Sequence, residues 1–225
     1  TAPSSPQTPF LDPRTVSRVS STPSPSEQNA LGHQYSPAAQ ARPGGGSGRF
    51  ALKLLVSNSM AGTLIGKGGS RICEIKEECC ADIKVTPNGR YYPGTHERVV
   101  LVVGEPASLQ SACDSIVSTI YTAADTSMDI TQRILIPDSA CGLIIGDDGG
   151  RLRLLRQMAG VASIQVAPLD SSTVAGERVF TLQGPMMSVV RSLALIVEIM
   201  TEDPIASRYQ NMSTIYRAVH MDMHP

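Results

Sequence analysis

The chain has 225 residues, with 19 Lys plus Arg against 20 Asp plus Glu and a formal net charge of −1. This length fits one or two domains of ordinary size. The balanced charge excludes a histone-like protein that coats nucleic acid through overall positive charge. No apolar run approaches the roughly 20 residues that a membrane helix needs, so we expect no membrane partner. Aromatic residues make up only 4% and Trp is absent, which disfavours base recognition by aromatic stacking on a sheet.

The cysteines and histidines point away from a disulfide scaffold, a metal site or an enzyme. The cysteine count is odd and no CxxC pair occurs, which disfavours a disulfide framework and a zinc knuckle. Most of these cysteines occupy apolar-periodic positions, so we expect buried free thiols in a reducing compartment, the nucleus or the cytoplasm. No HExxH motif, GxSxG motif or paired-carboxylate site is present, and we predict no catalysis, cofactor or metal. The five cysteines discussed above are Cys73, Cys79, Cys80, Cys113 and Cys141.

Composition divides the chain into three zones. Residues 1–48 are rich in Ser, Thr, Pro and Gly, and lack apolar periodicity. Such a segment buries too little apolar surface to offset its ordering entropy, so we predict a disordered tail. Residues 49–203 are dense in Val, Ile, Leu and Met, and form the predicted folded part. Residues 204–225 are a weakly patterned C-terminal tail, with a short helix expected after Pro204.

The dense zone contains an internal repeat at an offset of 80 residues. Gly62-Thr63-Leu64-Ile65-Gly66 matches Gly142-Leu143-Ile144-Ile145-Gly146, and Glu97-Arg98-Val99 matches Glu177-Arg178-Val179. We therefore predict two domains, the first repeat at 49–125 and the second repeat at 128–203. Because the join between them is very short, the two repeats must lie close together.

Each repeat predicts the element order β-α-α-β-β-α. In the first repeat, Phe50, Leu52, Leu54 and Val56 alternate with other residues as one face of a strand. The further expected elements are a helix at 61–65, a glycine turn at 66–69, a helix from 70 to 79, strands at 82–86 and 98–103, and a long helix after 105. An antiparallel three-stranded sheet with three helices on one face buries all these apolar sides, which predicts an α+β fold.

The glycine turn Gly66-Lys67-Gly68-Gly69 is open to two interpretations. The simplest is a tight turn that requires positive φ. A P-loop is excluded because only three residues separate Gly62 from the Gly66-Lys67 pair, and a dinucleotide fingerprint is excluded because Arg71 stands where its third glycine belongs. The other interpretation is a phosphate contact: glycine lets a phosphate chain approach, and amides at a helix start carry partial positive charge. Lys67 and Arg71 would add full charges beside that contact.

Each repeat resembles a type I KH (K-homology) domain over residues 50–202. Residues 61–69 are similar to the helix–GxxG–helix core of that family, and 91–99 (Tyr-Tyr-Pro-Gly-Thr-His-Glu-Arg-Val) are similar to the variable loop and following strand of Nova-type KH domains. The poly(C)-binding proteins are close relatives within this family. The resemblance implies binding of single-stranded RNA, usually pyrimidine-rich, or sometimes single-stranded DNA. It also implies a clamp on about four nucleotides and roles in splicing, stability or translation, without catalysis.

We expect the RNA-binding residues to lie in the first repeat. Apolar side chains would form a narrow floor for unstacked bases, and Lys84 and Arg90 would donate to bases or phosphates, or else remain solubilising surface charges. Asp82 stands where many relatives have a basic residue. It could accept a hydrogen bond from cytosine or simply face solvent. The predicted set is Met60, Gly62, Leu64, Ile65, Gly66, Lys67, Gly68, Gly69, Arg71, Ile83, Lys84 and Arg90.

The second repeat departs from the pattern at its turn, which reads Gly146-Asp147-Asp148-Gly149. Two carboxylates would face the phosphate path, where each like-charge contact costs roughly 1 kcal/mol or more, so we expect impaired RNA binding. Arg151, Arg153 and Arg156 follow, either as secondary phosphate contacts or as a solvated helix face. The alternative function for the chain is a protein-interaction scaffold, with other KH proteins or a second copy as partners.

Overall fold

A computed structural model describes residues 48–122, 128–168, 176–203 and 211–216. The predicted disordered tail and the helix expected after Pro204 lie outside these residues. Within them, no helix combines the length and the apolar character needed to cross a bilayer.

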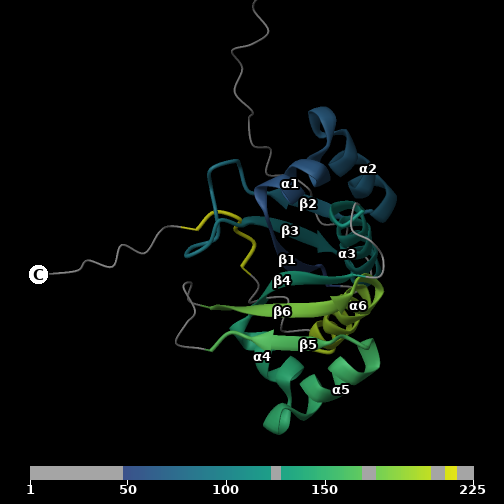
Figure 1. Cartoon of the computed structure of the whole chain (residues 1–225), viewed down its shortest axis with the longest axis vertical. Helices are drawn as coiled ribbons and strands as arrows, with labels where there is room; N and C mark the ends of the chain where they lie inside the picture. The colour runs from purple at the N-terminus through teal and green to yellow at the C-terminus, as the bar shows by residue number, and fades with distance from the viewer. Residues whose placement is uncertain (1–47, 123–127, 169–175, 204–210, 217–225) are drawn as a thin grey trace, which may run out of the picture. The chain divides into compact units, whose positions relative to one another are not determined.

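Both repeats have the predicted element order (Figure 1). The first repeat consists of β1 (Phe50–Val56), α1 (Asn58–Ile65), the short 3-10 turn η1 (Lys67–Gly69), α2 (Ser70–Cys79), β2 (Asp82–Val85), β3 (Arg98–Gly104) and α3 (Pro106–Ile120). The second repeat consists of β4 (Asp129–Pro137), α4 (Asp138–Ile145), η2 (Asp147–Gly149), α5 (Gly150–Ala159), β5 (Ser163–Val166), β6 (Glu177–Pro185) and α6 (Met186–Thr201).

Local sequence signals explain where the helices of the first repeat begin and end. The Ser57 hydroxyl accepts a hydrogen bond from the Met60 amide at 3.2 Å and caps α1, so this helix starts three residues earlier than apolar periodicity alone predicts. The helix α2 ends at Cys80 in the left-handed region, with φ of 51°. Pro106 is tolerated at the first position of α3 because its missing N–H has no partner there.

The structure joins the two expected three-stranded sheets into one six-stranded antiparallel sheet, in the order β2-β3-β1-β4-β6-β5. The junction is the pairing of β1 with β4, in which Leu54 lies opposite Ile134. These two residues are 80 positions apart and therefore equivalent in the two repeats. A pseudo-two-fold axis passes between them, as in the interface of a symmetric dimer.

The helices of both repeats cover one face of this sheet, and their apolar sides form a single core. The alternating residues Leu52, Leu54 and Val56 of β1 are buried in it together with Ile134 and Ile136 of β4. The helices α3 and α6 contact each other, and the Gln110 side chain donates to the Ala194 carbonyl at 3.2 Å. Because one cluster runs through both repeats, we expect them to unfold together.

The other face of the sheet carries a second apolar cluster that sequence patterning does not reveal. Tyr92, from the loop between β2 and β3, is 1% exposed and packs with Leu55, Val99 and Leu135. Tyr216, from the segment 211–216, packs edge-on against Tyr92 with ring centroids 5.1 Å apart. The segment that resembles a variable loop thus supplies a core residue. Part of the predicted C-terminal tail crosses the sheet without forming a helix.

Two ion pairs link the repeats at equivalent positions. Lys53 of β1 bonds Glu177 at 2.6 Å, and Arg133 of β4 pairs with Glu97. Lys53 and Arg133 are 80 residues apart, as are Glu97 and Glu177, so the pairs are related by the pseudo-two-fold axis. They differ in exposure: the Lys53 and Glu177 side chains are 4% and 3% exposed, whereas those of Arg133 and Glu97 are 32% and 25% exposed.

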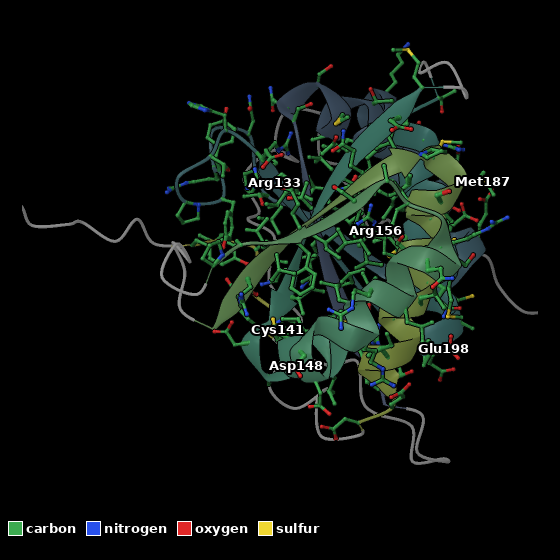
Figure 2. All side chains as sticks on the ribbon, turned by 60° about the horizontal axis from the view of Figure 1, so that its bottom comes forward. Arg133, Cys141, Asp148, Arg156, Met187 and Glu198 are labelled. Atoms are coloured by element: carbon green, nitrogen blue, oxygen red, sulfur yellow. The ribbon has the colours of Figure 1, made fainter. Side chains whose placement is uncertain are left out.

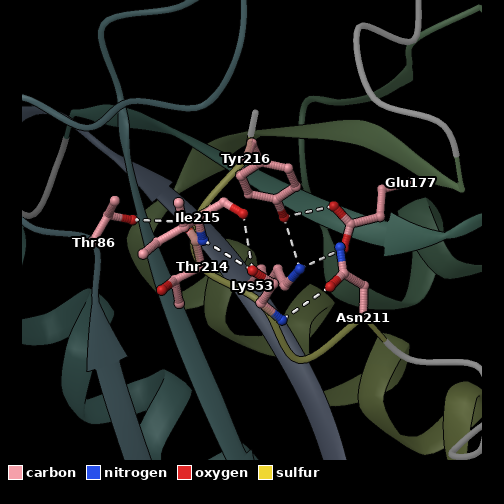
Figure 3. Close-up of polar contacts among 8 residues, drawn as sticks. Lys53, Thr86, Glu177, Asn211, Thr214, Ile215 and Tyr216 are labelled. Carbon is pink, nitrogen blue, oxygen red and sulfur yellow. Dashed lines mark hydrogen bonds and ion pairs between the residues drawn. The ribbon is translucent and has the colours of Figure 1, made fainter. Parts of the chain in front are cut away.

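Tyr216 accounts for this difference because it covers only the first pair (Figure 3). Its hydroxyl donates to Glu177 Oε2 at 2.6 Å and accepts from Lys53 Nζ at 2.7 Å. Burial lowers the pKa of Lys53, and Glu177 opposes this shift. Burial and the hydrogen bond to Glu177 raise the pKa of Tyr216.

Candidate nucleic-acid interface

The glycine loop of the first repeat is a compact turn between α1 and α2. Gly66 has φ of 73°, and a Cβ at that position would lie 2.7 Å from the Cβ of Arg71. Gly68 and Gly69 also have positive φ, of 62° and 86°. The tight-turn interpretation is therefore confirmed at Gly66. The phosphate contact stays a prediction, for which the same turn leaves the backbone bare.

Within the described structure, the start of α2 lacks a side-chain cap next to this turn, although the Ser70 amide donates to the Lys67 carbonyl. The N-cap position of α2 is Gly69. Uncapped amides at a helix start carry partial positive charge and favour an anion. Lys67 is exposed in the turn itself. Gly62, on α1, is exposed, and a Cβ there would meet no protein atom within 4 Å. The loop thus combines donors, one full positive charge and open space.

Arg71, which stays a predicted phosphate contact, is bonded within the protein. Its guanidinium donates to Glu74 Oε2 at 3.0 Å and to the Thr119 hydroxyl at 3.3 Å. These contacts hold the side chain against α2 and α3, so its charge is compensated by Glu74 instead of standing free beside the turn.

Fewer residues of the predicted apolar floor reach the protein surface than expected. Leu64 is fully buried and Ile83 is 1% exposed, and both belong to the core. Their neighbours Met60 and Ile65 are only half-buried and retain surface that a base could contact. The expectation is thereby corrected: Leu64 and Ile83 support the floor from beneath.

The polar residues of β2 point to the face of the sheet that the helices leave free. Since side chains alternate along a strand, Asp82 and Lys84 lie opposite the buried Ile83. Lys84 lines a small pocket with Leu101, Val103 and Met212 on that free face, and its role as a donor to bases or phosphates stays a prediction. Asp82 pairs with Arg49. Arg90 is exposed in the loop after β2, where its amide donates to the Pro87 carbonyl.

The turn of the second repeat has the same backbone shape with opposite charge. Gly146 has φ of 68°, and a Cβ there would lie 2.6 Å from the Cβ of Arg151, matching the crowding at Gly66. Asp148 occupies the position of Gly68 with φ of 50°, a conformation that non-glycine residues adopt only at some cost. Asp147 and Asp148 are both exposed. Two carboxylates therefore stand where the first repeat has Lys67 and a bare glycine.

The three arginines of α5 separate into different environments. Arg151 donates to both carboxylate oxygens of Glu202, at 2.9 and 2.6 Å, and to the Leu143 carbonyl at 3.2 Å. Arg153 donates to the Asp148 carbonyl at 2.9 Å and so braces the acidic turn. Arg156 lines a shallow surface pocket with Arg153, farther along α5 from Asp148 (Figure 2). Only Arg153 is thus bonded to the turn.

Sequence reasoning missed the residue that anchors the start of α1. Arg98 is 6% exposed, and its Nε donates to the Thr86 carbonyl at 2.8 Å. Its Nη1 donates to the Asn58 side chain at 3.3 Å, which ties β3 and the end of β2 to the helix that leads into the glycine turn. Arg178 binds the Ala167 carbonyl in the same way. The repeated Glu-Arg-Val motif is the sequence feature that could have revealed this contact. Its arginine links the strands to the first helix, and its glutamate forms the ion pair between repeats.

The cysteines follow the prediction in part. Cys79, Cys113 and Cys141 are buried, and all five thiols are free. Cys73 and Cys80 are exposed, which corrects the expectation for these two. Burial raises the pKa of Cys113 to about 12 and that of Cys141 to about 11.

The KH domain family model matches residues 51–118 and 131–198. RNA-binding protein Nova-2 from Homo sapiens is 30% identical over 187 residues, which cover 75% of this chain and 38% of the relative. RNA-binding protein Pasilla from Drosophila melanogaster is 26% identical over 181 residues, covering 75% of this chain and 23% of the relative. Far upstream element-binding protein 1 from Homo sapiens is 29% identical over 155 residues, covering 65% of this chain and 23% of the relative. The chain thus matches between 23% and 38% of the length of these relatives.

The matched ranges coincide with the two repeats, and each contains a glycine turn between two helices and three antiparallel strands. The resemblance noted in the sequence is thereby confirmed, and the chain belongs to the KH domain family.

Proposed function

We propose that this chain binds single-stranded RNA and that the first repeat clamps about four nucleotides at its Gly66–Gly69 turn. The observation that carries the proposal is the combination at this turn of a helix start without a side-chain cap, the exposed Lys67 and the open space above Gly62. Two of the relatives are named RNA-binding proteins, which supports the same class of ligand. Such binding would serve post-transcriptional control, through splicing, stability or translation.

In this proposal the second repeat contributes little to phosphate binding. Asp147 and Asp148 replace the cation and the bare backbone, and Arg151 is neutralised by Glu202. Arg153, bonded to the Asp148 carbonyl, offsets only part of the negative charge at the turn. The second repeat instead completes the six-stranded sheet on which the first repeat depends.

The test is fluorescence anisotropy with labelled, randomised single-stranded RNA at fixed salt. The double variant Lys67→Asp, Gly68→Asp gives the first turn the sequence of the second. We expect its affinity to fall at least about tenfold, or 1.4 kcal/mol. In a salt series, the slope of log affinity against log salt should shrink by about 0.7 for each phosphate that the variant no longer binds.

The matched control is Lys76→Asp, Gly176→Asp, which changes the same residue types and the same charge. Gly176 has φ of 87° and open space around its Cα, so backbone strain is matched to that at Gly68. This control should bind RNA as the parent does. An equal fall in affinity for both double variants would show a general charge effect and contradict the clamp.

The converse change separates the two repeats. Asp147→Lys with Asp148→Gly should add a phosphate contact and strengthen binding, because the backbone of the second turn already has the required shape. Running randomised single-stranded DNA of the same length in parallel determines which nucleic acid is preferred, since only RNA carries the 2′-hydroxyl.

A further inference from the structure

The second repeat has an apolar groove between α5 and α6. It measures about 200 Å³, and its lining includes Leu154, Met158, Leu195 and Ile199. Leu154 and Met158 are 54% and 60% exposed. Exposed apolar side chains that gather in a groove mark interaction sites more often than isolated ones do, and flexible methionine side chains adapt to a partner surface.

The first repeat shows that the KH fold does not require this groove. Eighty residues earlier, Leu154 is replaced by Glu74, Met158 by Glu78, Leu195 by Ser115 and Ile199 by Thr119. The corresponding pocket there is lined by Arg71, Asp114, Ser115, Ser118, Thr119 and Thr122, all of them polar. Two copies of one backbone thus differ on the same face, so the apolar character belongs to the second repeat alone.

The charges around the groove select the kind of partner. Glu198 of α6 and Glu202, which follows that helix, line the groove, and Arg151 is held by Glu202. Among the described residues Glu198 takes part in no ion pair. The rim is therefore acidic overall, which repels nucleic-acid phosphates and favours a cation. Met187 of α6 is 57% exposed. By helical periodicity it lies on the same face of α6 as Glu198, toward the opposite end of that helix (Figure 2).

The size and shape of the groove exclude other occupants. Small-molecule sites generally enclose about 300 Å³ or more, which exceeds this volume. A second folded copy would need a total of about 1,200 Å² or more of buried surface, whereas this groove accepts only a few side chains. A groove between two helices suits the apolar stripe of a third, with anchors at i, i+3 or i+4, and i+7.

We propose that the α5–α6 groove of the second repeat binds an amphipathic helix of a partner protein. The apolar stripe of that helix covers Leu154, Met158 and Leu195, and a Lys or Arg beside the stripe pairs with Glu198. This site is independent of the glycine turns, so the second repeat acts as a protein-binding module beside the RNA clamp.

The test uses the intact chain and a displayed library of amphipathic helical peptides of roughly 15 residues, about the shortest length for a stable isolated helix. The apolar positions and the flanking charges are randomised. Selection on the parent is followed by counter-selection on Leu154→Glu, Met158→Glu, which gives α5 the glutamates of α2. Both substituted side chains are exposed, and unchanged thermal melting confirms that this variant folds.

We expect enriched peptides that carry an apolar stripe with a flanking Lys or Arg. They should bind the double variant at least about tenfold more weakly, as expected for anchor residues. Glu198→Lys should weaken the same peptides and favour versions with Glu at the flanking position. The control Glu74→Gln, Glu78→Gln, on the equivalent face of the first repeat, should leave peptide binding unchanged.

Three results would overturn this proposal. One is the absence of any enriched peptide that distinguishes the parent from the double variant. Another is a matching fall in RNA affinity for Leu154→Glu, Met158→Glu, which would assign the groove to RNA. The last is concentration-dependent dimerisation in analytical ultracentrifugation that this variant abolishes, which would assign the groove to a second copy.

Discussion

The two ion pairs between the repeats should differ sharply in their effect on stability. Glu177→Gln and Glu97→Gln remove the same charge at positions related by the pseudo-two-fold axis and preserve the side-chain shape. Glu177→Gln leaves Lys53, 4% exposed, without its counter-charge, and breaking such a buried pair costs about 3 kcal/mol or more. Glu97→Gln leaves Arg133, 32% exposed, where water compensates and the cost is about 1 kcal/mol or less.

The measurement is urea unfolding of both variants at pH 7, followed by circular dichroism. We expect unfolding free energies that differ by about 2 kcal/mol, with an unchanged dependence on urea. The double variant Lys53→Met, Glu177→Leu is the control for charge, because replacing both partners of a buried pair by apolar residues is often neutral or stabilising. Equal costs for the two glutamine variants would refute the reasoning that burial under Tyr216 sets the strength of the pair.

The pH dependence gives an independent check on the same variant. Burial already lowers the pKa of Lys53 in the folded protein. Between that lowered value and the unfolded value near 10.4, the unfolded chain binds more protons, so this group makes stability rise with pH. Without Glu177 the pKa should fall further. The unfolding free energy of Glu177→Gln should therefore lie below that of the parent by a smaller amount at pH 10 than at pH 7.

Three further measurements follow from single positions. Cys73 and Cys80 are exposed and should react rapidly with a thiol reagent at pH 8, whereas Cys113, with its pKa raised to about 12, should react only on unfolding. Asp148→Gly should raise the unfolding free energy by about 0.5–1 kcal/mol, because it relieves a positive φ in a side chain with a Cβ; a decrease would show that the Asp148 carboxylate makes a stabilising contact. Burial and Glu177 raise the pKa of Tyr216, so above pH 10, where an unfolded Tyr ionises, the parent should lose up to about 1.4 kcal/mol per pH unit at this residue. In a pH series of urea titrations, the unfolding free energy of Tyr216→Phe should fall less steeply above pH 10 than that of the parent.

Much of the fold could be predicted because its signals are local. Alternation in residues 50–56, the apolar stripe of α2 and the duplicated glycine turns each predict an element without knowledge of the rest. The fusion of the two sheets could not be read in this way. Strand pairing between β1 and β4 depends on both edges being free, and the sequence shows only that the repeats are adjacent.

The site was predicted at the level of its backbone and less well at its side chains. Gly66 and Lys67 lie where the motif places them. Arg71 was expected to offer its charge beside the turn, but its guanidinium bonds Glu74. Lys84, predicted as a base or phosphate donor or a surface charge, lies on the face of the sheet that the helices leave free. Tyr216 had no sequence signal, because its contacts with Lys53 and Glu177 join segments 163 and 39 residues apart respectively.

The pseudo-two-fold axis between Leu54 and Ile134 has a consequence for how a long RNA could travel over the protein. The strand order places β2 and β5 at opposite edges of the sheet, with five strand spacings between them, or about 24 Å at 4.8 Å each. A two-fold axis perpendicular to the sheet also reverses the direction of equivalent elements. An RNA path past the glycine turn of one repeat would therefore run antiparallel to the equivalent path of the other. A single RNA molecule that followed both paths with the same 5′-to-3′ polarity would have to turn back on itself between them. Under the proposed function, in which the acidic turn of the second repeat binds no phosphate, that requirement disappears and RNA follows a straight path through the first repeat.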